Sequence, residues 1–134
     1  MHLLFVCTGN AARSQMAEGW ARHLAPAALI ESGGTHPAGL SSRAVAVMAE
    51  VGIDISAQSS KSLEETAWRN ADIVITLCGS ARENCVALLW SSHTRRKHWR
   101  ITDPVSGMAN DNPLIPFRMA RDDIHARLEE FLKA

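Results

Sequence analysis

HLLFVCTGNAARSQMAEGWARHL occupies residues 2–24 and changes its pattern twice. Residues 2–6 form a short apolar run that stops at a Thr-Gly-Asn turn, which predicts a buried strand. After the turn, Met16, Trp20 and Leu24 recur every four positions. That spacing predicts a helix with one apolar face. A buried strand that turns tightly into a helix is typical of an α/β fold.

The rest of the chain continues this alternation of strand and helix patterns. Further strands are predicted at residues 28–32 and 73–77, with a weaker one at 97–101. Three further helices are predicted. One follows the cap Ser41, a second begins at the capping box of Ser62 and Glu65 and runs through Trp68, and a third begins at Pro116. We therefore expect one α/β domain over residues 1–134, with a four-stranded parallel sheet and helices on both faces.

Composition excludes several classes of protein. A formal net charge of zero argues against a nucleic-acid or anionic-membrane binder. The apolar run at residues 1–6 is too short for a signal peptide, and no apolar stretch reaches the length of a membrane span. We expect a cytoplasmic monomer. In that compartment, an odd count of three cysteines favours catalytic or redox thiols over structural disulfides.

Cys7 is predicted to lie at the carboxyl end of the first strand, where doubly wound sheets bind ligands. The small residues after it can turn consecutive N–H groups inward as an anion nest, and the following helix adds its positive dipole end. These donors would bind a phosphate-like oxyanion and favour the thiolate of Cys7, to which Ser14 could donate a hydrogen bond. Arg13 offers a fork for two oxygens. The expected oxyanion-binding residues are Thr8, Gly9, Asn10, Ala11, Ala12, Arg13 and Ser14.

A second cysteine cluster follows the strand predicted at residues 73–77. Cys78 and Cys85 lie seven positions apart. Cys78 and Cys85 can be interpreted as small buried core residues. Cys7 can likewise be interpreted as a buried cysteine beside a helix-capping turn. Next to an oxyanion loop, however, the pair is better interpreted as redox-active.

The motif from Val6 to Asn10 and from Arg13 to Gly19 resembles the low-molecular-weight tyrosine phosphatase superfamily, in particular its thioredoxin-coupled arsenate reductases. The resemblance runs nearly end to end. It also covers Glu31–Thr35, Gly52–Ser56, Asp72–Cys78, His98-Trp99 and Asp103-Pro104.

Two features favour the reductase branch. Phosphatases of this group follow the aspartate-proline pair with tyrosines, whereas Val105-Ser106 follow it here and the chain contains no tyrosine. The segment from Thr76 to Cys85 matches the redox segment of the reductases. The resemblance thus implies an arsenate reductase that serves arsenic detoxification. The alternative is a tyrosine or small-molecule phosphatase, either as the main activity or as a side activity.

The resemblance also implies a mechanism. The Cys7 thiolate attacks arsenic while Asp103 acts as general acid. Cys78 then attacks the Cys7 sulfur, Cys85 attacks Cys78, and thioredoxin reduces the Cys78–Cys85 disulfide. If residues 80–85 are helical, Cys78 and Cys85 are roughly 10 Å apart along the axis. Disulfides require Cα separations of about 4.4–6.8 Å, so the segment must unwind.

Some members of this group bind potassium beside the loop through an asparagine, a glutamate, a serine and an aspartate. Asn10, Glu18 and Ser32 match the first three positions, but Lys61 stands in place of the aspartate. Its ammonium would repel a cation and could itself fill the position. We therefore expect no potassium site, and no other metal or bound cofactor.

A small zinc-binding module is the competing interpretation from another class. It would use Cys78, Cys85, His93 and His98. Structural zinc sites usually separate their first two ligands by two to four residues, whereas six residues separate the two cysteines here. The spacing therefore disfavours zinc.

Overall fold

Every residue of the first strand, β1 (His2–Cys7), is buried. The computed structural model describes residues 1–86, 90–105 and 112–133, with residues 84–86 described by their backbone alone. The other elements are α1 (Arg13–Leu24), β2 (Leu29–Gly34), α2 (Ser42–Ala49), the 3-10 turns Leu63–Glu65 and Trp68–Asn70, β3 (Ile73–Thr76), α3 (Gly79–Val86), β4 (Arg95–His98) and α4 (Leu114–Lys133).

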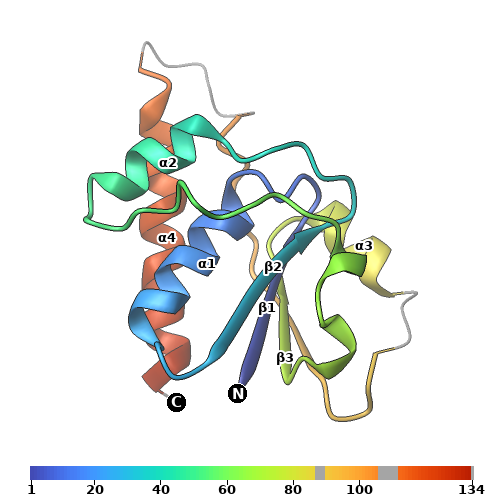
Figure 1. The fold of residues 1–134 in the computed structure, drawn as a ribbon. Coiled ribbons are helices and arrows are strands. Elements are labelled where there is room, and N and C mark those ends of the chain that lie inside the picture. Colours follow the sequence, from blue (N-terminus) through green and yellow to red (C-terminus); the bar gives the residue numbers. More distant parts are fainter. Residues whose placement is uncertain (87–89, 106–111, 134) are drawn as a thin grey trace.

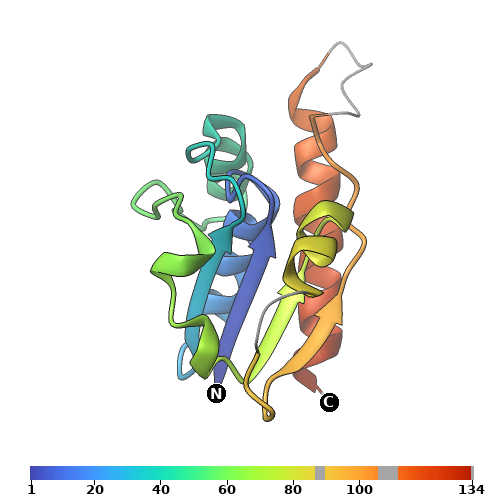
Figure 2. The ribbon, with the colours of Figure 1, turned by 90° about the vertical axis from the view of Figure 1, so that its right-hand side faces the viewer.

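The four strands form one parallel sheet in the order β2-β1-β3-β4. Helices α1, α2 and α4 cover one face, while α3 and the 3-10 turns lie on the other (Figure 1). The view turned by 90° shows the same two outer layers with the sheet between them (Figure 2). The predicted four-stranded parallel sheet with helices on both faces is confirmed.

Alternate residues of β1 pack into two separate hydrophobic cores, because successive side chains of a strand point to opposite faces of the sheet. Leu3 and Phe5 pack into the large cluster with α1, α2 and α4. Leu4 and Val6 pack into a smaller cluster that includes Ala81 of α3. A central parallel strand buried on both faces is therefore apolar throughout, as β1 is.

The start of α2 follows the prediction. The Ser41 hydroxyl oxygen accepts the N–H of Ala44 at 3.2 Å, and Gly52 lies beyond the end of the helix with φ of +81°. The capping box of Ser62 and Glu65 also forms, with the Ser62 N–H donating to the Glu65 carboxylate at 2.8 Å.

The α-helix predicted to run from that box through Trp68 is wrong, because only two separate 3-10 turns form. Thr66 leaves helical geometry, with φ of −97° and ψ of 164°, and its hydroxyl donates to the Leu63 carbonyl at 2.6 Å. A threonine side chain that bonds nearby backbone in this way competes with helix continuation.

Two other boundaries are corrected. The fourth strand was predicted at 97–101 but spans Arg95–His98, because the four residues of β3 pair with those four. Helix α4 begins at Leu114, so Pro116 is its third residue. That position tolerates proline because first-turn N–H groups have no partner within the helix.

No helix within residues 1–86, 90–105 and 112–133 has the length and hydropathy needed to cross a membrane.

Candidate active site

The loop between β1 and α1 turns its carbonyl groups outward. The carbonyl oxygens of Thr8, Gly9 and Ala11 accept the N–H groups of His36, Ala38 and Ser41 at 2.8, 2.9 and 2.9 Å. In the part of the chain that the structure describes, no N–H of residues 9–12 donates to a protein acceptor. Outward carbonyls and uncommitted amides are the arrangement of an anion nest.

Asn10 fixes the shape of this loop. It is the one residue other than glycine with positive φ (+44°) in the described chain. Such a conformation needs support from its surroundings. The side-chain amide supplies it with four hydrogen bonds: it donates to Ser14 Oγ (2.8 Å) and Ser32 Oγ (3.0 Å), and accepts from the Lys61 N–H (2.9 Å) and Gln15 Nε2 (3.1 Å).

The Cys7 thiol lies at the start of this loop and is 4% exposed. Its sulfur is 2.9 Å from the Ser14 hydroxyl oxygen. Helix α1 begins beside it without a side-chain cap, since Ala12 occupies the N-cap position. The uncapped N–H groups and the helix dipole favour negative charge at this point.

Arg13 joins three segments of the site. Its Nη1 donates to the Ile101 carbonyl at 3.0 Å and to the Leu77 carbonyl at 3.4 Å. Leu77 directly precedes Cys78, and Ile101 lies two residues before Asp103. Among the described residues Arg13 donates through Nη1 alone, so Nε and Nη2 remain as donors for an oxyanion.

Asp103 is half-buried on a tight turn, where one carboxylate oxygen accepts the N–H of Val105 at 2.9 Å. The anchoring of Ile101 by Arg13 ties this turn to the Cys7 loop.

Cys78 lies at the edge of the loop, with its sulfur 3.2 Å from the hydroxyl oxygen of Thr8. Its carbonyl accepts the Arg82 N–H at 3.1 Å, and its sulfur accepts the Ala81 N–H at 3.4 Å. Cys78 is therefore the N-cap of α3, a role that sequence reasoning missed because cysteine is not a usual cap.

Cys85 lies in the α3 backbone, while its side chain is outside the described residues. It lies seven positions after Cys78, which corresponds to about 10 Å along a helix axis. The structure thus brings Cys7, Arg13 and Cys78 together and keeps position 85 away.

Arg22 pairs with Glu18, a contact that sequence reasoning missed. Its Nε donates to Glu18 Oε2 at 3.0 Å, and its Nη2 donates to the Ile30 carbonyl at 2.9 Å. Lys61, expected near Glu18, instead directs Nζ toward the Ser59 carbonyl at 3.5 Å. Four-residue spacing of glutamate and arginine on one helix face would have revealed the pair.

The histidines of the zinc alternative have other partners. His98 Nδ1 lies 2.7 Å from the Thr76 hydroxyl, and His93 Nε2 is 3.6 Å from Asp72 Oδ1. Burial, and next the charge of Arg82, lower the pKa of His98. Within the described residues no three His, Cys, Asp or Glu side chains form a metal-binding group.

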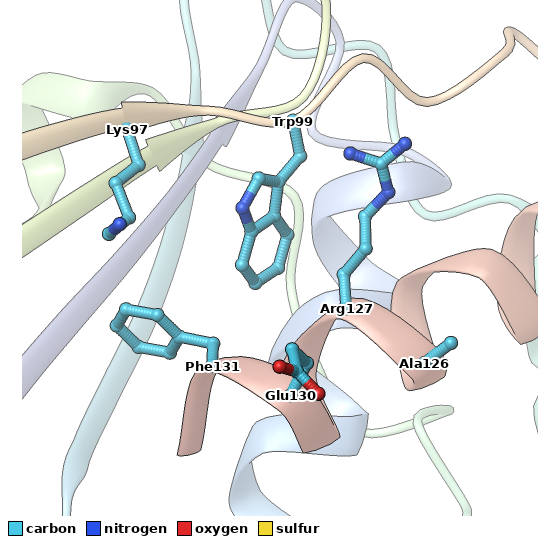
Figure 3. Close-up of a pocket in the computed structure, with 6 residues that line it drawn as sticks. All are labelled: Lys97, Trp99, Ala126, Arg127, Glu130 and Phe131. Atoms are coloured by element: carbon cyan, nitrogen blue, oxygen red, sulfur yellow. The ribbon is translucent and has the colours of Figure 1, made fainter. Parts of the chain in front are cut away.

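A separate pocket lies between β4 and the end of α4 (Figure 3). Lys97 Nζ lies 5.5 Å from the centre of the Phe131 ring, which meets Trp99 edge-on at 5.9 Å between ring centres. None of the predicted site residues lines this pocket.

Comparison with known proteins places this site in context. An arsenate reductase of Bacillus subtilis is 42% identical over 131 residues, which are 96% of this chain and 93% of the relative. A solved arsenate reductase in its oxidized state is 35% identical with a TM-score of 0.80, and another in its phosphate binding state is 31% identical with a TM-score of 0.79. Both structures cover 98% of this chain, which covers 96% of each.

The family model of the low molecular weight phosphotyrosine protein phosphatases matches residues 2–134. The chain belongs to this family, and the curated relative reported above is an arsenate reductase.

Proposed function

We propose that this chain reduces arsenate to arsenite with electrons from its own thiols. One observation carries the proposal: the Cys78 sulfur lies 3.2 Å from Thr8, the residue that follows the nucleophile Cys7. A phosphatase needs one thiol and a water, whereas arsenate reduction needs a second thiol within reach of the first. The arsenate reductases among its relatives support the same activity.

In the first step, arsenate binds to the N–H groups of residues 9–12 and to Arg13. The Cys7 thiolate forms a bond to arsenic, which remains pentavalent, and one arsenate oxygen leaves as water. Asp103 supplies the proton for that oxygen. The outward carbonyls of the loop support this binding geometry because they leave the N–H groups for the anion.

In the second step, the Cys78 thiolate attacks the Cys7 sulfur. The electron pair of the sulfur–arsenic bond passes to arsenic, arsenite departs and a Cys7–Cys78 disulfide forms. Cys85 then attacks Cys78, which releases the Cys7 thiolate and leaves a Cys78–Cys85 disulfide. An external dithiol protein, in our proposal thioredoxin, reduces that disulfide and completes the two-electron cycle.

We also propose that the reaction does not depend on potassium, because the residues around Glu18 do not fit a bound cation. Arg22 already pairs with the Glu18 carboxylate, and Lys61 replaces the fourth ligand of the potassium-binding members. Assays in potassium and sodium salts at equal ionic strength test this. A Michaelis constant for arsenate that is lower in the potassium salt than in the sodium salt would contradict this proposal.

The proposed function is tested by paired assays on one preparation: arsenate reduction coupled to thioredoxin, and hydrolysis of an aryl phosphate. We expect multiple turnovers of arsenate and much slower phosphate ester hydrolysis. Efficient hydrolysis without arsenate turnover would instead establish the phosphatase alternative. A Cys7→Ser variant, inactive in both assays, confirms that each activity uses this site.

A further inference from the structure

A continuous chain of hydrogen bonds leads from the surface of the molecule to the Cys7 sulfur. At its outer end the Arg22 side chain is 54% exposed, while the Glu18 side chain with which it pairs is 4% exposed. The other Glu18 oxygen, Oε1, accepts the Ser32 hydroxyl at 2.6 Å. A buried carboxylate requires compensation of this kind, because its charge is costly to remove from water.

The direction of each hydrogen bond follows from the chemistry of its partners. An ionised carboxylate can only accept, so the Ser32 hydrogen points to Glu18 and the Ser32 oxygen accepts from Asn10 Nδ2 at 3.0 Å. The second hydrogen of Asn10 Nδ2 goes to Ser14 Oγ at 2.8 Å. The Ser14 hydrogen is then available for the Cys7 sulfur, 2.9 Å away.

We propose that Arg22 is a positioning residue for Cys7, acting through its ion pair with Glu18. Its charge balances the buried carboxylate at the head of the chain. Glu18 in turn orients Ser32, which orients the amide of Asn10. The result is a loop held in its strained shape, with a serine hydrogen directed at the sulfur.

Removal of the Arg22 charge has a predictable sign. It leaves a buried negative charge uncompensated near the loop, which disfavours both the Cys7 thiolate and a bound oxyanion. Removal of the Glu18 charge has the opposite sign, because it leaves a cation without its anion. Asp54 and Lys61 line the same surface pocket as Arg22 and Glu18, but Lys61 Nζ lies against the Ser59 carbonyl.

The test measures the pH profile of Cys7 alkylation by iodoacetamide, in a background with Cys78 and Cys85 replaced by serine. For Arg22→Met we expect a midpoint at higher pH. Alkylation at pH 7 should be slower by about fivefold, which is at the lower end of the coupling typical between two sites. Glu18→Gln should shift the midpoint to lower pH. The midpoints of the Arg22→Met/Glu18→Gln double variant and of Arg22→Lys should be close to that of the parent protein.

Arg127→Met is the matched control, because it removes an ion pair of the same i,i+4 spacing, with Asp123 on α4. It should leave the midpoint unchanged. Unfolding temperatures of all variants separate loss of fold from the effect on Cys7, since a merely structural role would lower the temperature without moving midpoints in opposite directions. A parental midpoint in folded Arg22→Met overturns the proposal. If that variant does not fold, a parental midpoint in Glu18→Gln overturns it.

This role serves the reaction proposed above, but alkylation needs no substrate. An unchanged profile refutes the role of Arg22 alone, whereas failure of arsenate turnover in the unmodified protein refutes the proposed function alone.

Discussion

At the scale of single residues, the site depends on a few positions where the neighbouring backbone of the oxyanion loop restricts which side chain can be accommodated. Gly34 is one of them. A Cβ atom there would lie 2.7 Å from the Thr8 carbonyl oxygen and 3.0 Å from the Asn10 nitrogen. Both contacts are with backbone, so no side-chain rotation can relieve them.

We therefore expect Gly34→Ala to displace the loop and lower kcat/KM for arsenate on the order of tenfold to a hundredfold, the range for misplaced catalytic groups. Gly52→Ala is the matched control, because Gly52 has φ of +81° but no atom within 4 Å of the added Cβ. Both variants should unfold at lower temperature, and only Gly34→Ala should lose activity per folded molecule. Equal activities would refute the argument.

Arg13 is the second such residue, since its guanidinium anchors the Leu77 and Ile101 carbonyls and, in the proposed reaction, also binds the anion. Arg13→Lys keeps the charge but loses the planar fork. We expect kcat/KM for arsenate to fall about a hundredfold, as for loss of one preorganised donor in other enzymes. Steady-state assays measure this loss. The control is Lys97→Arg, which also exchanges one basic side chain for another but lies away from the loop, and a loss of kcat/KM below about threefold for Arg13→Lys would contradict the prediction.

How far the sequence predicts such residues depends on whether their role is local. Cys7 and Ser14 flank one turn, and the contact between them was predictable from that turn. The anchoring of Ile101 by Arg13 spans 88 positions and the anchoring of Leu77 spans 64, so no local pattern reveals them. The Arg22 pair is local, but its importance depends on the burial of Glu18, which only the fold determines.

At the scale of elements, α3 is the part of the molecule that the proposed reaction must rearrange. The Cys78 sulfur caps the helix in the reduced protein, and Cys85 lies in the same helix. Once Cys78 is bonded to Cys7, its sulfur is a weaker hydrogen-bond acceptor, which weakens the cap. Unwinding of α3 then brings Cys85 within disulfide distance.

A more stable α3 should slow this step. Gly79→Ala introduces no clash with the described residues, because none of their atoms lies within 4 Å of the added Cβ and φ is not positive. Such a change stabilises by about 0.4–1 kcal/mol, which corresponds to a rate about two- to fivefold lower. Rapid alkylation followed by mass spectrometry should show slower conversion of the Cys7–Cys78 disulfide into Cys78–Cys85. The first release of arsenite should be unaffected; equal conversion rates would contradict the requirement for unwinding.

The contact between α2 and α4 predicts a pH dependence of stability. The hydrogen bond from Arg118, with help from Arg121, lowers the pKa of Glu50 from 4.5 to about 2. Above pH 4.5 the carboxylate is ionised in both folded and unfolded chains, and the pair contributes fully. Between pH 4.5 and 2 the unfolded chain takes up the proton first, so this stabilisation is lost as pH falls.

We expect Glu50→Gln to unfold at lower temperature than the parent protein at pH 7, with a difference that shrinks between pH 4.5 and 2. Thermal unfolding followed by circular dichroism measures both proteins across this range. A difference that stays constant down to pH 2 would rule out Glu50 as its source.

Elements differ in how well the sequence predicts them. The first three strands and the helix capped by Ser41 follow from apolar runs and a cap, which are local signals. The fourth strand was predicted two residues too late at its start and three at its end, because its bounds come from pairing with β3 and its own residues are basic and mostly exposed. The two 3-10 turns were missed because a correct capping box does not determine how far a helix continues.

At the scale of the whole molecule, the parallel sheet brings together thiols that are far apart in the chain. β1 pairs with β3, so the ends of these strands place Cys7 and Cys78 at the same edge of the sheet. The strand order β2-β1-β3-β4 puts this pair at the centre, where the chain reverses its direction of winding. The proposed relay is a consequence of this topology together with the unwinding of α3.

The most direct test of the relay is arsenate turnover by Cys85→Ser with thioredoxin present. We expect one equivalent of arsenite per protein followed by arrest, with a Cys7–Cys78 disulfide found by peptide mass spectrometry. Undiminished multiple turnover would contradict it, because Cys78 would then transfer its electrons without the third thiol.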